Sequence, residues 1–151
     1  MSEFNSLKLE QFSGRPLLAI DYGSKVVGLA SFQPGSDPFP TPFGKIIYQS
    51  DKQVCEELLI ILNNECIEAI VLGLPRYEDG NESTMTKRVK SFSKLLSEMV
   101  QEIEIHFQDE TFSSFAAENR MKESAQYNFK VDQKQIDAVA ACIILEDFFK
   151  A

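Results

Sequence analysis

The chain has 151 residues, of which 44% are hydrophobic and 25% are charged, and its formal net charge at pH 7 is −8. This length suits one domain with a sizeable core, and no apolar run reaches the roughly 18–20 residues of a bilayer-spanning helix. The acidic balance argues against a protein held on nucleic acid by a global positive field, but it leaves room for an enzyme that meets phosphates through metal ions and local lysines.

The first residues and the cysteines indicate where the protein works. Residues 1–16 lack the basic segment and apolar stretch of a signal peptide, so we expect a polar leader there and a single domain over 17–151. Cys55, Cys66 and Cys142 are odd in number and scattered, which favours reduced thiols in a core. Together these features predict a cytoplasmic protein without a membrane partner.

Three short strands are predicted at the start of the domain. Apolar runs over 17–21 and 26–32 predict two strands joined through Gly23 by a tight antiparallel connection. The proline-rich and glycine-rich stretch 33–44 predicts a loop, and residues 45–50 predict a third strand. Three strands in succession favour an antiparallel meander.

The pattern then changes to alternating helices and strands. Helices are predicted over 52–65 (capped by Asp51), 83–101, 113–122 and 133–149, and strands over 67–75 and 103–110. This order predicts an α/β fold with a mixed five-stranded sheet, in which the antiparallel meander is followed by two parallel strands and helices flank both faces. Functional residues in such sheets gather beyond the carboxyl ends of the parallel strands.

Acidic residues stand at those ends. Asp21 ends the first strand, Asp109 and Glu110 end the last, and Asp137 lies in the first turns of the C-terminal helix. If that helix crosses the crevice between the two strands, Asp21, Glu110 and Asp137 converge. Clustered carboxylates repel one another and resist desolvation, and a hard divalent cation resolves both problems. The pattern favours one or two Mg²⁺ or Mn²⁺ ions that serve phosphodiester hydrolysis, although each acid alone also suits a turn cap, a solvated strand end or a helix N-terminus.

One basic segment is a candidate for phosphate binding. Residues 83–97 contain Lys87, Arg88, Lys90 and Lys94 and no acid. The N-terminus of their predicted helix should face the crevice, where the helix dipole and nearby bases favour a phosphate. A solvated helix face explains the same pattern equally well.

Four blocks of the sequence resemble the YqgF/RuvX family of ribonuclease H-like proteins, which are described as Holliday junction resolvases and pre-16S rRNA nucleases. The blocks are "LLAIDYGSKVVGLA", "IVLGLPRYEDGNES…KRVKSF", "DETFSSFAAENRM" and "QIDAVAACIILEDFF", and together they span residues 17–149. The resemblance implies a ribonuclease H-like fold and a hydrolase acting on phosphodiesters. It makes Asp21 the first-strand metal ligand and gives Glu110 and Asp137 the other two acidic positions, with Asp109 assisting beside Glu110.

Other positions of the family pattern are also present. Gly23 and Gly28 match glycines where the backbone turns and packs closely, Lys25 matches a basic position, and Gly73 and Pro75 are expected to shape the turn that follows their strand.

The sequence departs from the family pattern in two places. Thr111 stands where the family usually has arginine, and the loop over 124–134 carries only Lys130 and Lys134 against Asp132, where the family loop is often strongly basic. Both departures remove basic residues that would bind phosphate, and neither changes the acidic residues that would bind a metal.

The resemblance implies a metal-dependent nuclease in ribosome biogenesis that processes the 5′ end of pre-16S rRNA. One alternative is a Holliday junction resolvase-like DNA endonuclease, which needs two sites and therefore a dimer. Another is a catalytically inactive nucleic-acid-binding or scaffold protein. An RNA precursor is the favoured partner, branched DNA stays open, and we expect a monomer or a weak homodimer. A nucleotide-binding kinase or ATPase is disfavoured because the chain supplies only one lobe and no phosphate-loop motif.

Overall fold

The computed structural model of the chain describes residues 4–76, 79, 81–110 and 113–151, without the side chains of 113 and 114. Its sheet has five strands: β1 (Leu17–Asp21), β2 (Val26–Phe32), β3 (Thr41–Ile47), β4 (Ala69–Pro75) and β5 (Glu104–Glu110). They lie in the order β3-β2-β1-β4-β5. β1, β2 and β3 pair antiparallel, whereas β1, β4 and β5 are parallel neighbours, which confirms the predicted mixed sheet.

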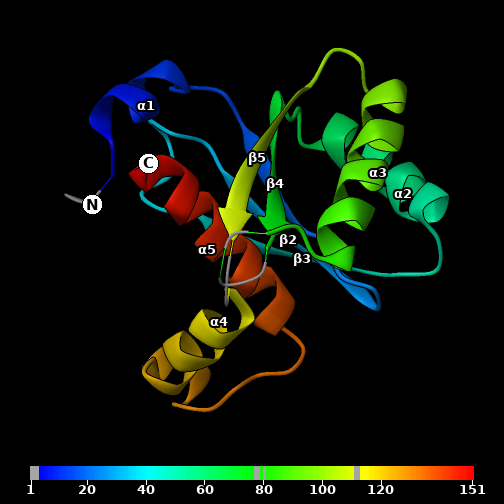
Figure 1. The fold of residues 1–151 in the computed structure, drawn as a ribbon. Coiled ribbons are helices and arrows are strands. Elements are labelled where there is room, and N and C mark those ends of the chain that lie inside the picture. Colours follow the sequence, from blue (N-terminus) through cyan, green and yellow to red (C-terminus); the bar gives the residue numbers. More distant parts are fainter. Residues whose placement is uncertain (1–3, 77–78, 80, 111–112) are drawn as a thin grey trace.

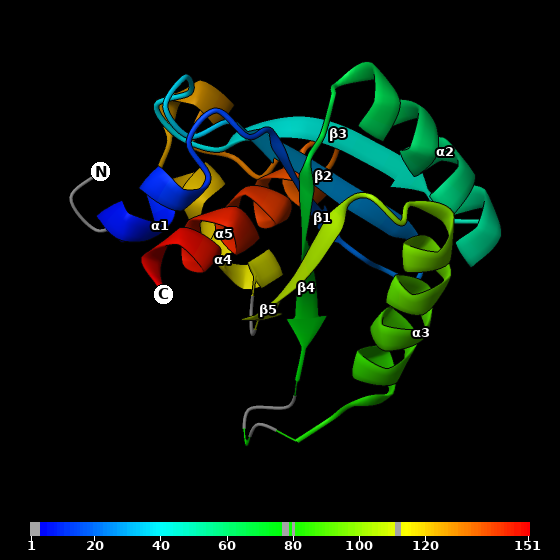
Figure 2. The same cartoon turned by 90° about the horizontal axis from the view of Figure 1, so that it is seen from above.

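Helices cover both faces of this sheet, as Figures 1 and 2 show. The helices are α1 (Ser6–Gln11), α2 (Asp51–Asn64), α3 (Thr84–Met99), α4 (Ser113–Lys122) and α5 (Ile136–Lys150), and a 3₁₀ turn covers Ala125–Tyr127. α2 and α3 pack on one face, and α5 crosses the other face with α1 and α4 beside it. None of the described helices has the length and apolarity to cross a membrane.

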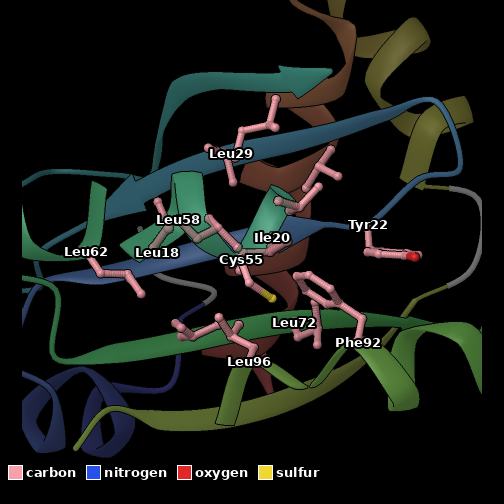
Figure 3. Packing of buried hydrophobic residues seen from close by; sticks show 14 of the residues in the cluster. Leu18, Ile20, Tyr22, Leu29, Cys55, Leu58, Leu62, Leu72, Phe92 and Leu96 are labelled. Atoms are coloured by element: carbon pink, nitrogen blue, oxygen red, sulfur yellow. The ribbon is translucent and has the colours of Figure 1, made fainter. Parts of the chain in front are cut away.

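Side-chain alternation along the strands divides the core into two clusters. In β1, Leu18 and Ile20 join the cluster under α2 and α3, part of which Figure 3 shows. Leu17 and Ala19 join the cluster under α5. Because successive strand residues point to opposite faces, the same alternation places the Asp21 side chain on the α5 face.

The N-terminal residues contribute to the core, which was not expected of a polar leader. Phe4 and Phe12 are buried against α5. The backbone N–H of Asn5 donates to the Phe149 carbonyl at 2.7 Å, and the Lys8 ammonium donates to the Phe148 carbonyl at 2.7 Å. The core therefore begins before residue 17. The pattern of two phenylalanines flanking one short helix was too sparse to predict this.

The third strand lies earlier than predicted. β3 covers Thr41–Ile47 instead of 45–50 and includes Pro42, which we had placed in a loop. β3 is an edge strand with a register shift opposite Leu29 and Ala30. An edge position tolerates a proline because its missing N–H leaves no ladder bond unmade.

Candidate active site

Three elements bring three carboxylates to one end of the sheet. Asp21 is the last residue of β1, Glu110 is the last residue of β5, and Asp137 lies in the first turn of α5. Glu110 shares a strand face with His106, whose ring contacts Phe148 of α5. Asp21 and Glu110 therefore both leave the sheet on the face that α5 covers, as the predicted convergence requires.

Two glycines allow this convergence by close approach. Gly28 pairs with Asp21 across β1 and β2, and a Cβ atom on Gly28 would lie 2.0 Å from the backbone oxygen of Asp137. A Cβ atom on Gly73 would lie 2.6 Å from Cδ1 of Ile144 and 3.2 Å from the carboxyl carbon of Glu110. Only glycine at position 28 lets the start of α5 rest on β2, and glycine at position 73 leaves room for the side chains of Ile144 and Glu110 beside β4.

The expected turn residues therefore separate into two kinds. Gly23 does lie in the connection between β1 and β2, whereas Gly28 and Gly73 lie inside strands. Pro75 is the last residue of β4 and pairs with Glu110. The close packing expected at Gly28 is confirmed by the approach of Asp137. The expectation that Gly28, Gly73 and Pro75 also shape turns was wrong, because all three lie within strands.

The three carboxylates affect one another electrostatically. Burial raises the pKa of Asp21 well above its usual range, and the negative charges of Glu110 and Asp137 and a hydrogen bond with Glu110 raise it further. Oε2 of Glu110 is fully buried. The charged form of Asp21 is therefore unfavourable at the place where the three acids converge.

This donor set suits a hard divalent cation. Carboxylate oxygens are the ligands that Mg²⁺ and Mn²⁺ prefer. Within the part of the chain that the structure describes, no three acidic, histidine or cysteine side chains stand in a ready-made coordination shell. Mg²⁺ is commonly held by one or two carboxylates together with waters and substrate phosphates. Asp21, Glu110 and Asp137 therefore fit a cation whose shell water and phosphate oxygens complete.

Asp109 is not brought into this cluster. It alternates with Glu110 and leaves β5 on the opposite face, where its Oδ1 lies 3.1 Å from Nε of Arg76 and its side chain is 70% exposed. Pro75 pairs with Glu110, and this register places Arg76 beside the end of β5. The contact between Arg76 and Asp109 could not be predicted, because the sequence does not reveal the register of two strands.

The predicted basic residues lie on the other side of the sheet. Lys87, Lys90 and Lys94 are exposed on α3, and Lys90 forms an ion pair with Glu82. α3 begins at the edge where β4 ends (Figure 2), so Lys87 is nearest to the crevice and Lys94 lies about 10 Å further along the helix axis. Lys25 is exposed in the connection that follows Asp21.

Arg88 differs from these lysines because its side chain contacts two tyrosines. Its Nη2 donates to the Tyr22 hydroxyl at 3.3 Å, and its guanidinium lies 5.6 Å and 5.7 Å from the ring centres of Tyr22 and Tyr48. Arg88 therefore supports the core at this edge, although its position on α3 suggested a phosphate ligand.

The segment before α5 forms a turn with little basic character. The 3₁₀ turn leads into Asn128 and Phe129, whose φ angles are +55° and +57°. Lys130 and Lys134 are exposed, and the Asp132 carboxylate accepts from the Lys134 amide at 2.9 Å. Thr111, the other departure from the family pattern, lies outside the described residues.

The fold and the carboxylates define a class. The five-stranded mixed sheet with flanking helices is the ribonuclease H-like fold of the RuvC-type resolvases. The structure of RuvC from Thermus thermophilus matches 85% of this chain and 92% of its own, with a TM-score of 0.55 at 10% identity. The yeast mitochondrial Holliday junction resolvase Ydc2 matches 92% of this chain and 79% of its own, with a TM-score of 0.52 at 12% identity.

Sequence comparison then gives the family. The family model "RuvX: Holliday junction resolvase" matches residues 15–151, and the chain belongs to this family of nucleases, which are hydrolases of phosphodiester bonds. A protein of Maridesulfovibrio salexigens, named "Putative pre-16S rRNA nuclease", is 38% identical over 86% of this chain and 94% of its own. A Rickettsia felis protein of the same name is 35% identical over 87% of this chain and 83% of its own.

Proposed function

We propose that this protein is a metal-dependent nuclease that processes the 5′ end of pre-16S rRNA in the cytoplasm. The observation that carries this proposal is the convergence of Asp21, Glu110 and Asp137 from three elements, at a place where burial and the two neighbouring charges raise the pKa of Asp21. Membership of a nuclease family and the names of the similar proteins support the reaction type and the substrate.

Metal binding and nucleic-acid binding would be carried out by residues on different sides of the sheet. Asp21, Glu110 and Asp137 would hold one or two Mg²⁺ or Mn²⁺ ions. When bound, such an ion supplies charge stabilisation for the phosphodiester and activation of a water nucleophile. Lys25 and Lys87 would orient the nucleic acid backbone near the carboxylates, and Lys90 and Lys94 would extend this contact along α3. We assign Asp109 no part in holding the ion, because it leaves β5 on the face opposite Glu110.

A Holliday junction resolvase-like activity is the second candidate. The description of the matched family and the RuvC-like fold favour it. Symmetric cleavage of a four-way junction requires two sites, so this activity would require a dimer. Processing of a ribosomal RNA precursor needs only a monomer or a weak homodimer. A third candidate, a nucleic-acid-binding protein without catalysis, is favoured by the net charge of −8 and by the small number of bases before α5.

One cleavage experiment separates these candidates. Labelled 16S rRNA precursor, single-stranded RNA and a four-way DNA junction are incubated with wild-type protein or Asp21→Asn in Mg²⁺ or Mn²⁺. We expect wild-type protein alone to cut the RNA precursor, and the cut to require the metal. Preferential cutting of the junction would favour the resolvase activity. Inactivity of both proteins on every substrate, together with intact RNA binding, would favour the binding protein.

A further inference from the structure

Tyr22 follows Asp21 directly and leaves the chain on the opposite face of the sheet. It belongs to the core cluster under α2 and α3 and is only 4% exposed. Its ring centre lies 4.7 Å from that of Phe92 and 5.9 Å from that of Tyr48. Figure 3 shows Tyr22 at the end of this core, with its hydroxyl directed away from the aliphatic residues.

The Tyr22 hydroxyl is held by side chains from other elements. It donates to Oδ1 of Asp51 at 2.5 Å, and the Tyr48 hydroxyl donates to the same oxygen at 2.9 Å. Arg88 donates to the Tyr22 hydroxyl from α3. Asp51 is the first residue of α2, and Ser50 caps this helix in place of the predicted Asp51. This Tyr22 network of Tyr22, Tyr48, Asp51 and Arg88 joins the end of β1 to α2, α3 and the residue after β3.

The ladder of β1 ends at the point where the network begins. The pairing with β4 ends at Ile20 and Leu72, and Asp21 pairs only with Gly28 of β2. The backbone of Asp21 thus has a strand partner on one side only. A phenylalanine at position 22 would fill the same core volume, so packing does not require the hydroxyl. A satisfied buried polar network does fix one arrangement of the groups that it joins.

We propose that Tyr22 is a positioning residue, whose hydroxyl bond to Asp51 fixes the end of β1 and thereby the direction of the Asp21 carboxylate. This inference rests on the proposed function, because it assumes that Asp21 binds a divalent cation. Its physical basis is that groups supporting a metal ligand commonly change metal affinity or activity by about 10- to 100-fold when they are removed. A displacement of about 1 Å at a reacting centre is costly on a similar scale.

Tyr48 provides a matched control. Tyr22→Phe and Tyr48→Phe each remove one hydroxyl that donates to the same Asp51 oxygen, and each keeps its ring. Only Tyr22 is the neighbour of Asp21 in the chain. A loss of general stability would lower the unfolding free energy of either variant, whereas a loss of positioning would lower the Mn²⁺ affinity of Tyr22→Phe alone.

The experiment measures the Mn²⁺ dissociation constant by calorimetry, together with kcat and KM on the RNA precursor. We expect Tyr22→Phe to raise the dissociation constant and lower kcat by about 10-fold each with KM unchanged, and Tyr48→Phe to stay within about 2-fold of wild type. Asp51→Ala removes the acceptor of both hydroxyls, so it should show at least the effect of Tyr22→Phe. The Tyr22→Phe/Asp51→Ala double variant should be no worse than Asp51→Ala alone, because both changes remove the same Tyr22–Asp51 bond.

The outcomes distinguish this inference from the proposed function. Equal effects of Tyr22→Phe and Tyr48→Phe on Mn²⁺ affinity, with wild-type protein active, would overturn the positioning role and leave the nuclease proposal intact. A wild-type protein that neither binds Mn²⁺ nor cleaves nucleic acid would overturn both.

Discussion

The two ends of the parallel strands both carry charged side chains, but they differ in how the charges are matched. At the amino ends, Arg15 precedes β1 and reaches Glu68 before β4 at 3.5 Å and Glu104 at the start of β5 at 3.2 Å. Hydrogen bonds from His106 and Arg15 lower the pKa of Glu104. At the carboxyl ends, Asp21 faces Glu110, and its pKa is raised.

The contrast separates charges that are paired within the fold from charges that we propose serve a reaction. Within the described residues, no ion pair that we identify joins Asp21 or Asp137 to a base. Converging carboxylates without a matching base oppose folding, and perturbed pKa values of this kind gather at functional sites. The amino ends thus show how this sheet matches its charges where no chemistry is required.

The largest expected effect comes from neighbouring acids on β5. Glu110→Gln removes a proposed metal ligand and should lower kcat for RNA cleavage by about 10³-fold, because several kcal/mol of charge stabilisation is lost. Asp109→Asn removes an acid of the opposite face and should stay within about 3-fold of wild type, since its exposed pair with Arg76 contributes little. Equal losses in the two variants, measured in single-turnover assays, would contradict the division of faces.

The contact between α5 and β2 gives the next effect. Gly28→Ala places a Cβ atom 2.0 Å from the Asp137 carbonyl oxygen, so we expect unfolding free energy to fall by about 1–3 kcal/mol and cleavage to fall with it. Gly14→Ala is the control, because it has a φ of +76° and nothing within 4 Å. It should cost about 1 kcal/mol in denaturant titrations and leave cleavage unchanged. A fully active and stable Gly28→Ala protein would contradict the close contact between Gly28 and the backbone of Asp137.

Removing the buried charge of Asp21, which Glu110 and Asp137 repel, should stabilise the metal-free protein. Since the pKa of Asp21 is raised in the folded state, the folded state keeps its proton longer, and stability falls as pH rises above the ordinary aspartate value of about 4. The Asp21→Asn variant has no carboxyl group to ionise at this position, so its stability does not fall with pH in this way. Its melting temperature should exceed that of wild type by about 2–4 °C at pH 7, or about 1 kcal/mol, and the difference should vanish below pH 4. A constant difference across pH would argue against a titrating Asp21.

The smallest effect is expected at the amino ends. Arg15→Gln breaks the pairs with Glu68 and Glu104, which are half exposed. Such pairs contribute about 0–1 kcal/mol. Thermal melting should therefore change little and cleavage should not change. A loss of cleavage in Arg15→Gln would show that the two ends are not independent.

The sequence predicted the strand order and the three converging acids because both depend on local patterns. The apolar run before Asp21 and the alternation that leads to Glu110 define strand ends, and parallel strands bring such ends to one edge. Asp137 was found because a helix beginning near that edge must pack small residues against the sheet, and the structure confirms this with Ala138, Ala140 and Ala141 buried.

The remaining features depend on register and on tertiary contacts. Asp109 and Glu110 point to opposite faces because they are neighbours in a strand. Which of them joins the carboxylate cluster depends on the face of β5 that meets α5. The burial of Phe4 and Phe12 depends on the C-terminal end of α5, which lies far away in the sequence. The Tyr22 network joins residues 66 positions apart, and no local pattern connects them.

Thermal melting with and without Mn²⁺ tests the central claim most directly, because a cation that binds the folded protein raises its melting temperature. We predict that millimolar Mn²⁺ raises the melting temperature of wild-type protein at pH 7 and reverses the advantage of Asp21→Asn, which should not respond. Equal responses of the two proteins to Mn²⁺, or no response of wild type, would contradict a metal site at the carboxyl ends of the strands.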